Sequence, residues 1–417
     1  MNQTATSSYN PYALKNVLFC LFVVFCIQFT ELKIDVVKVA EISLLLLTPF
    51  IYYRRINKYI LALLSLFTLW LLLTLLFNPF KDFYLLQNVS PLIRPYFISL
   101  GRFLELIACV NLAALVHNYT KKLDYKAILQ CIKQIFLLNM AVLLVFYTIY
   151  YLHRFGIIEN TYISYWNYRL RGWYSEGGPF GLMLGFTYIL TYLFQSKYNN
   201  FFRIILILTI VFTARSKAGI LFIVLWFILK YYKTMYAQLR RLNIFILIIG
   251  GLITAILFTK LATLYIDDIK HIKREINERP DDINLVMGRI AGVFIFPDMI
   301  LDHPVFGIGL GNYPLMRNNP KYRGLIPYSP PGKADAHGFG GLMQLLVDGG
   351  FFIFSLFLLL MILLIRQLKR NHTNLEIYMY CFLLFFILGV QIYFLYPWIL
   401  FGILLTLSKK PKQPYLI

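Results

Sequence analysis

Charged side chains are scarce in this chain, and acids are about half as common as bases. Only 14% of the 417 residues are charged, with 19 acids against 40 lysines and arginines, whereas 59% are hydrophobic and 18% are aromatic. A soluble protein of this composition would need a core too large for its surface. The composition therefore excludes an ordinary soluble domain and predicts an all-α integral membrane protein.

The sequence also lacks paired cysteines and metal-ligand patterns. The five cysteines stand in or beside apolar runs without paired spacing, which argues against disulfides and zinc. The acid pairs Asp267-Asp268 and Asp281-Asp282 are adjacent, so their side chains diverge, unlike the spaced acids typical of nucleotide-sugar transferases. No glycine-rich phosphate loop follows a strand, and there is no serine elbow. The sequence thus predicts neither a cofactor nor a metal.

Long apolar runs are what the chain has instead. The amino end lacks a positive stretch and a small-residue cleavage site, so the first apolar run is expected to be a retained span. Apolar runs of about 17 to 25 residues predict membrane spans. Twelve runs, three of them shorter, lie near residues 16–30, 34–53, 59–77, 95–116, 133–152, 179–195, 201–214, 218–232, 242–258, 341–365, 377–394 and 396–408. They predict spans 1–9 with short outer loops (1–258), one large outer loop (259–340) and spans 10–12 (341–417).

The basic residues predict the orientation, because lysine and arginine near span ends resist translocation. With the amino end inside, the predicted inner segments hold nineteen basic residues against two acids, Asp124 and Glu376. Both termini are therefore expected in the cytoplasm. The same bias accounts for most of the net charge of +21, so a nucleic-acid partner is not needed to explain it.

The outer loop 259–340 is different in kind from the inner segments. It carries ten basic and nine acidic residues together with many apolar ones, and it is too apolar for a disordered linker. Its prolines and a helix-like run from Ile283 to Leu301, interrupted at Pro297, predict a folded outer cap.

Several cations stand on the predicted outer side, against the topological bias. They are Arg169, Arg171, Arg215, Lys217 and Arg289. Arginine contacts phosphate oxygens through two parallel hydrogen bonds, and an apolar surround strengthens them. Arg169 and Arg171 lie in an aromatic, glycine-rich segment beside Glu176, which favours a binding loop for sugar and phosphate. The sequence therefore predicts that these residues bind an anionic glycan substrate.

A plainer interpretation competes for most of these residues. Arg169 and Arg171 could be solvated loop charges, and Arg289 could form an ordinary ion pair with a nearby aspartate. Glu176 could neutralise one of the arginines; alternatively it orients a substrate hydroxyl. Arg215 sits in a turn too short to hold it far from the bilayer, which favours a functional role.

One histidine, His337, precedes the apolar run that carries Asp348 and the pair Gly349-Gly350. An imidazole at a membrane surface can take up a proton near neutral pH, which suits it to act as a general base. The alternative is an interfacial anchor or helix cap.

Three segments resemble a known family, namely Arg215 to Gly219, Gly288 to Tyr313, and Ala336 to Gly350. They are similar to the O-antigen ligase and O-antigen polymerase superfamily of bacterial inner membranes, often called Wzy_C or WaaL-like proteins. The resemblance covers about 200–350 well and the amino-terminal half only by hydropathy.

The resemblance implies a GT-C-like membrane fold of about twelve helices and a metal-independent glycan transfer from a polyprenyl (undecaprenyl) diphosphate carrier on the periplasmic face. It implies that His337 is the catalytic histidine and that Arg215 and Arg289 bind the diphosphate. The chain departs from the family's pattern at Gly338, where asparagine is usual.

Three functions stay open. A polymerase adding repeat units of O-antigen or another surface polysaccharide is favoured slightly by the aromatic loop 162–174; a ligase would transfer glycan to lipid A-core. A transporter or flippase of lipid-linked oligosaccharide is disfavoured, because few charges lie in the predicted spans. The expected partners are the lipid-linked donor, a glycan or lipid A-core acceptor, membrane lipid and a chain-length regulator protein.

Overall fold

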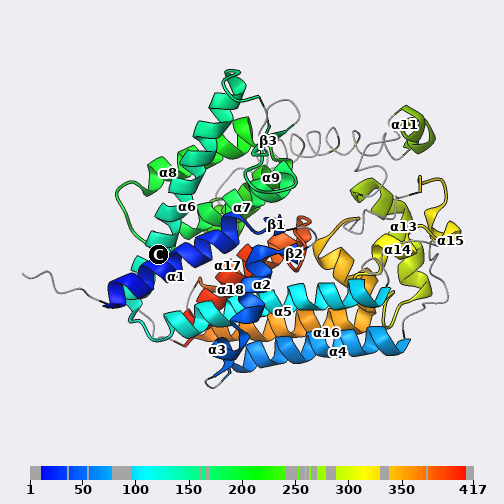
Figure 1. Cartoon of the computed structure of the whole chain (residues 1–417), viewed down its shortest axis with the longest axis horizontal. Coiled ribbons are helices and arrows are strands. Elements are labelled where there is room, and N and C mark those ends of the chain that lie inside the picture. Colours follow the sequence, from blue (N-terminus) through cyan, green and yellow to red (C-terminus); the bar gives the residue numbers. More distant parts are fainter. Residues whose placement is uncertain are drawn as a thin grey trace, which may run out of the picture. The chain divides into compact units, whose positions relative to one another are not determined.

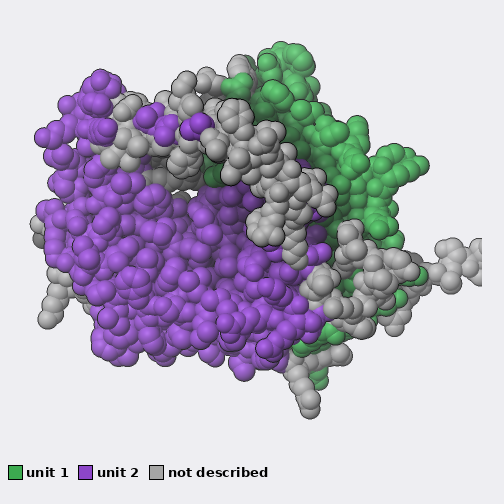
Figure 2. All heavy atoms as spheres, turned by 180° about the vertical axis from the view of Figure 1, so that it is seen from behind, with its two compact units in different colours: residues 1–55, 108–223, 394–417 green, residues 56–107, 224–393 purple. Residues whose placement is uncertain are grey.

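The described part of the chain falls into two compact units. The structure, a computed structural model, describes residues 11–34, 37–53, 56–77, 95–159, 162–165, 169–239, 270–278, 288–328, 338–371 and 374–409, and only positions 252, 259 and 263 between 240 and 269. Unit 1 comprises residues 1–55, 108–223 and 394–417, and unit 2 comprises residues 56–107 and 224–393 (Figure 2).

Within the part of the chain that the structure describes, four helices are long and apolar enough to cross a membrane. They are α4 (Lys58–Phe77), α5 (Pro95–Thr120), α6 (Tyr125–Arg154) and α16 (Gly341–Asn371) (Figure 1). They match the predicted runs 59–77, 95–116, 133–152 and 341–365. The described chain is mostly helical, which confirms the coarse prediction of an all-α membrane protein.

Other apolar helices match most of the remaining predicted runs. They are α1 (Pro11–Gln28), α7 (Gly177–Leu190), α8 (Asn199–Leu208) with the π-helical turn η3 (Thr209–Thr213), α9 (Lys217–Leu239), α17 (Glu376–Ile387) and α18 (Leu395–Leu407). The run 242–258 lies outside the described residues, apart from position 252.

The predicted single span at 34–53 is wrong, because the segment is broken twice. A hairpin pairs β1 (Lys33–Ile34) with β2 (Val37–Lys38), and two short helices follow, α2 (Val39–Leu46) and α3 (Thr48–Tyr52). Proline at position 49 has no amide to continue the helical ladder. The hydroxyl of Thr48 donates instead to the carbonyl of Leu45, at 2.6 Å.

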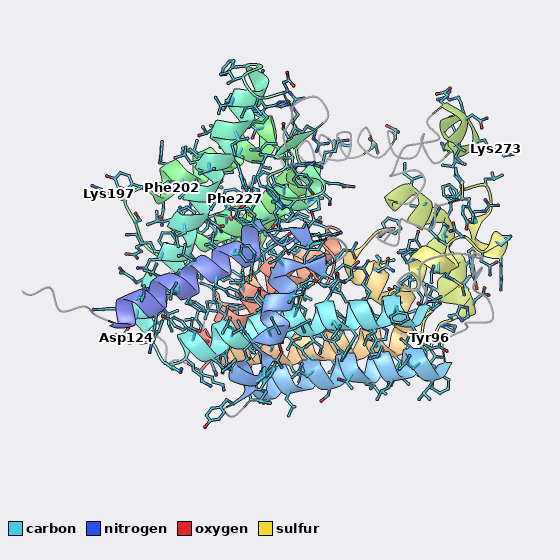
Figure 3. All side chains as sticks on the ribbon, viewed as in Figure 1. Tyr96, Asp124, Lys197, Phe202, Phe227 and Lys273 are labelled. Atoms are coloured by element: carbon cyan, nitrogen blue, oxygen red, sulfur yellow. The ribbon has the colours of Figure 1, made fainter. Side chains whose placement is uncertain are left out.

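In unit 1, α1 packs along α6. Asp124, labelled in Figure 3, begins α6 by accepting a hydrogen bond from the amide of Ala127 at 2.6 Å, a standard helix cap. Further along, Gln28 donates to Asn139 at 3.0 Å between buried side chains. All five cysteines of the chain are free and buried.

In unit 2, α4 lies beside α16 and runs antiparallel to it (Figure 1). Two hydrogen bonds fix the pairing: the hydroxyl of Tyr59 donates to Gln367 at 2.8 Å, and the indole of Trp70 donates to the carbonyl of Asp348 at 3.4 Å. The first residues of α4 therefore meet the last turns of α16.

Helix α16 is interrupted at Gly350, whose φ of 62° and ψ of −176° are open only to glycine. The loop before position 313 fills the break: the amide of Phe351 donates to the carbonyl of Pro304 at 2.8 Å, and the amide of Ile308 donates to that of Val347 at 3.0 Å. The buried carboxylate of Asp348 accepts from the amide of Gly311 at 3.1 Å. The glycine-rich run 307–312 thus serves as a structural insert.

The rest of unit 2 includes four short helices that follow position 270. They are α11 (Ile272–Glu278), α13 (Arg289–Asp302), α14 (Tyr313–Met316) and α15 (Pro320–Arg323). They share a core that includes Ile295, Phe296, Met299 and Tyr313. The predicted interruption at Pro297 is wrong, because α13 continues through it to Asp302. Core packing of both halves of the helix outweighs the hydrogen bond that proline removes.

Candidate functional site

The first turns of α7 and α9 touch in unit 1. A Cβ on Gly181 would collide with the side chain of Ser216, and a Cβ on Gly219 would lie 2.8 Å from the carbonyl oxygen of Gly181. One helical turn further, Gly185 lies against the ring of Phe222, 2.6 Å from a Cβ placed there. Glycine alone permits this approach, and it brings the two helix N-termini to one place.

Ser216 links the two helices. Its hydroxyl accepts a hydrogen bond from the amide of Gly219 at 3.0 Å, so Ser216 caps α9, and it donates to the carbonyl of Gly178 in α7 at 3.3 Å. The residue is fully buried. The partial positive charges of both N-termini are therefore held side by side.

Arg215 precedes this cap in an unusual backbone conformation. Its φ is 47°, which lies in the left-handed region. For a residue with a Cβ this conformation costs about 1–2 kcal/mol. Its side chain is exposed, as is that of Lys217. Two helix N-termini and two exposed cations together make this edge of unit 1 suited to bind an anion.

Arg169 holds the strained turn. Its guanidinium donates to the carbonyl of Arg215 at 3.1 Å and to that of Ala214 at 3.4 Å. It reaches the turn from β4 (Arg169–Leu170), which pairs with β3 (Ser164–Tyr165). In the structure these hydrogen bonds stabilise the backbone of the turn at 214–215. The assignment of Arg169 as a substrate ligand stays a prediction.

Arg171 also stabilises backbone through its guanidinium, in the aromatic loop 162–174 and the residue that follows it. It donates to the carbonyl of Tyr162 at 2.7 Å and to that of Ser175 at 2.9 Å, and its guanidinium lies 4.2 Å from the centre of the Tyr162 ring. These bonds close the aromatic loop on itself. The predicted substrate contact of Arg171 likewise stays a prediction.

Two carboxylates border this loop. Glu176 stands at the N-cap position of α7, is exposed, and makes no capping hydrogen bond with its side chain. Glu31, which the sequence did not single out, accepts hydrogen bonds from the amide and, at 3.1 Å, the hydroxyl of Ser175. Burial raises the pKa of Glu31, and the bonds from Ser175 oppose that rise. Glu31 thus ties the loop to the end of α1.

The other predicted residues belong to unit 2. His337 lies outside the described residues, as do Asp281 and Asp282, the predicted ion-pair partners of Arg289. Arg289 is the first residue of α13, and its side chain is not described. One turn later, a Cβ on Gly292 would lie 3.1–3.3 Å from Phe339 and Gly338. The backbone after position 337 is therefore packed against the first turns of the helix that Arg289 begins.

Gly338 has a steric reason to be glycine. Its φ is +50°, and a Cβ there would come within 2.6 Å of the ring of Phe296 and 3.1 Å of the hydroxyl of Tyr313. The family's usual asparagine tolerates this backbone conformation, but the ring occupies the space that its side chain needs. Packing against Phe296 therefore leaves no room at this position for the asparagine that the resemblance led us to expect.

No protein-family model matches the chain, and no curated protein matches it either. Within the described ranges, no group of three or more histidine, cysteine, aspartate and glutamate side chains could hold a metal ion. Metal independence stays a prediction.

The sequence alone did not predict that Ser216 caps α9, or that Gly181 and Gly219 bring the two helices into contact. The spacing of Gly181 and Gly185, four residues apart in an apolar run, was a signal for close helix packing. Nothing in the sequence alone pointed to Glu31 or to the bracing bonds of Arg169, because both depend on segments far apart along the chain.

Proposed function

We propose that this chain is a membrane glycosyltransferase that moves glycan from a polyprenyl diphosphate carrier, as a polymerase of O-antigen or a similar surface polysaccharide. The observation that supports it is the geometry of one edge of unit 1, where α7 and α9 begin together beside the exposed Arg215 and Lys217. Fixed amide dipoles and cations of this kind stabilise a diphosphate without a metal.

The chemistry divides between two tasks. The acceptor hydroxyl attacks the anomeric carbon of the donor sugar, and the bond from that carbon to the diphosphate oxygen breaks with its electron pair on the leaving group. In this proposal Arg215, with Arg289 as the resemblance implies, offsets the charge on the diphosphate, and neutral His337 accepts the proton of the hydroxyl.

The finer features of the fold are part of the same proposal. They comprise about twelve membrane helices in a GT-C-like arrangement, residence in a bacterial inner membrane, cytoplasmic termini and a reaction on the periplasmic face. Their support is the sequence: the apolar runs, the basic inner segments and the three family-like motifs.

The proposal is tested by glycan transfer with purified full-length protein and a lipid-diphosphate glycan donor. His337→Ala should lower the rate by about 10²–10⁴-fold while donor binding persists, because a positioned base is worth that much. His337→Gln should be as inactive as His337→Ala, since glutamine keeps a polar side chain but cannot accept the proton. The wild-type rate should rise with pH through the ordinary histidine pKa of about 6.5, as the imidazole becomes neutral.

The matched control is His271→Gln, an exposed histidine outside the family-like motifs. It should retain full activity. Substantial transfer by His337→Gln would contradict the assignment of His337 as the general base. It would instead support a role for His337 as an interfacial anchor. The acceptor that the protein uses distinguishes a polymerase from a ligase. Transfer to carrier-linked glycan supports a polymerase, and transfer only to lipid A-core would show a ligase.

A further inference from the structure

A basic groove lies in unit 2 where α4 begins and α16 ends. It has a volume of about 510 Å³ and is lined from both helices. The bond from Tyr59 to Gln367, at 2.8 Å, joins the two helices there. The groove is at the C-terminal end of α16, whereas Gly338 and the neighbouring backbone precede its N-terminal end.

All the charged residues that line the groove are positive. They are Lys58, Arg366 and Arg370. All three are exposed, and none of them forms an ion pair with any residue in the described ranges. Arg366 and Arg370 are four residues apart and so lie on one face of α16, where like charges repel. An anion bound between them would remove that repulsion.

The other part of the groove is apolar. It is lined by Ala62 of α4 and by Leu360 and Leu363 of α16, and 42% of Leu363 is exposed. Both helices are long and apolar enough to cross a membrane. Cations at the end of two spans, continuous with an apolar wall along them, match a ligand with a phosphate at one end and acyl chains at the other.

We propose that this groove binds the phosphate of an anionic membrane phospholipid, with its acyl chains along α4 and α16. Arginine suits this role because its planar guanidinium donates two parallel bonds to phosphate oxygens. The bound lipid would hold the ends of α4 and α16 together, in addition to the bond from Tyr59 to Gln367. This site is separate from the proposed donor site and does not depend on it.

The test measures thermal unfolding of the delipidated full-length protein in detergent, with added phosphatidylglycerol, phosphatidylcholine or inorganic phosphate. Phosphatidylglycerol should raise the unfolding midpoint of the wild type, because a ligand that binds only the folded state stabilises it. The double variant Arg366→Gln/Arg370→Gln should bind this lipid roughly tenfold or more weakly, since two charge-assisted contacts are lost. Lipid copurification, read by native mass spectrometry, should fall in parallel.

The matched control is Lys369→Gln, which removes an exposed cation from the same turn of α16 but outside the groove. It should keep the wild-type shift. An equal loss in Lys369→Gln would show a nonspecific charge effect, and an equal shift with phosphatidylcholine or with inorganic phosphate alone would show that no anionic lipid is selected. Each of these results overturns the proposal.

A second variant guards against misfolding of the double variant. Lys58→Gln changes the cation on the other helix and leaves α16 intact. If the double variant does not fold, a reduced shift in Lys58→Gln supports the groove, and an unchanged shift overturns it.

Discussion

Arg215 has a left-handed backbone conformation although it carries a side chain, and its carbonyl is held in place by Arg169. Glycine would fit this position with less strain, so the arginine side chain is retained against the preference of the backbone. Strain of this kind is often found where a side chain has a functional task. Under the proposed function, stability and diphosphate binding therefore make opposite demands on this position.

Substitutions at Arg215 separate these demands. Arg215→Gly should be about 1 kcal/mol more stable to unfolding than Arg215→Ala, because only glycine relaxes in the left-handed region. Both should lose transfer activity by at least tenfold, or about 1.4 kcal/mol in the barrier. Thermal unfolding measures the difference in stability, and transfer assays on the same preparations measure the loss of activity. Activity near the wild-type level in the glycine variant would contradict a role in binding the diphosphate.

Position 338 illustrates the limit of reading single residues from the sequence. The sequence shows a glycine at this position, but it does not show which side chain occupies the space beside it. The ring of Phe296 comes from 42 positions earlier in the chain, and only the folded packing of α13 brings it against Gly338. A side chain that is excluded by a distant neighbour leaves no local pattern.

At the scale of elements, hydropathy located helices better than it located their breaks. The runs at 59–77, 95–116 and 133–152 became single helices, because nothing in them interrupts the ladder. The run at 34–53 did not, and the run at 341–365 hides the break at Gly350. Mean hydropathy does not register one proline or one left-handed glycine.

The contact between α7 and α9 should be sensitive to a single methyl group. Gly181→Ala should destabilise the protein by about 1–3 kcal/mol, because the added carbon would collide with Ser216. It should also lower transfer activity, since the two helix N-termini would be pushed apart. Gly178→Ala is the matched control in the same helix, where a Cβ meets nothing within 4 Å. Equal stability of the two variants would show that the helices are not held at this distance.

At the scale of the whole molecule, the orientation in the membrane rests on the distribution of basic residues. The structure supports one element of it: the bond from Tyr59 to Gln367 puts the start of α4 and the end of α16 on the same side, as the basic inner segments predict. The large outer segment should then face the opposite side. Neither helix length nor packing distinguishes the two sides of a bilayer, so the orientation itself needs chemical labelling.

Cysteine labelling in intact spheroplasts makes this test with little background, because all five native cysteines are buried. A membrane-impermeant thiol reagent should modify Leu325→Cys, at a site that is 59% exposed in the outer segment. It should modify Lys369→Cys, in the last turns of α16, only after the membrane is permeabilised. Both positions are exposed in the structure, so a difference between them reports the side of the membrane and not burial. The reverse pattern would place the segment 259–340, which includes His337, on a side where the proposed periplasmic reaction could not occur.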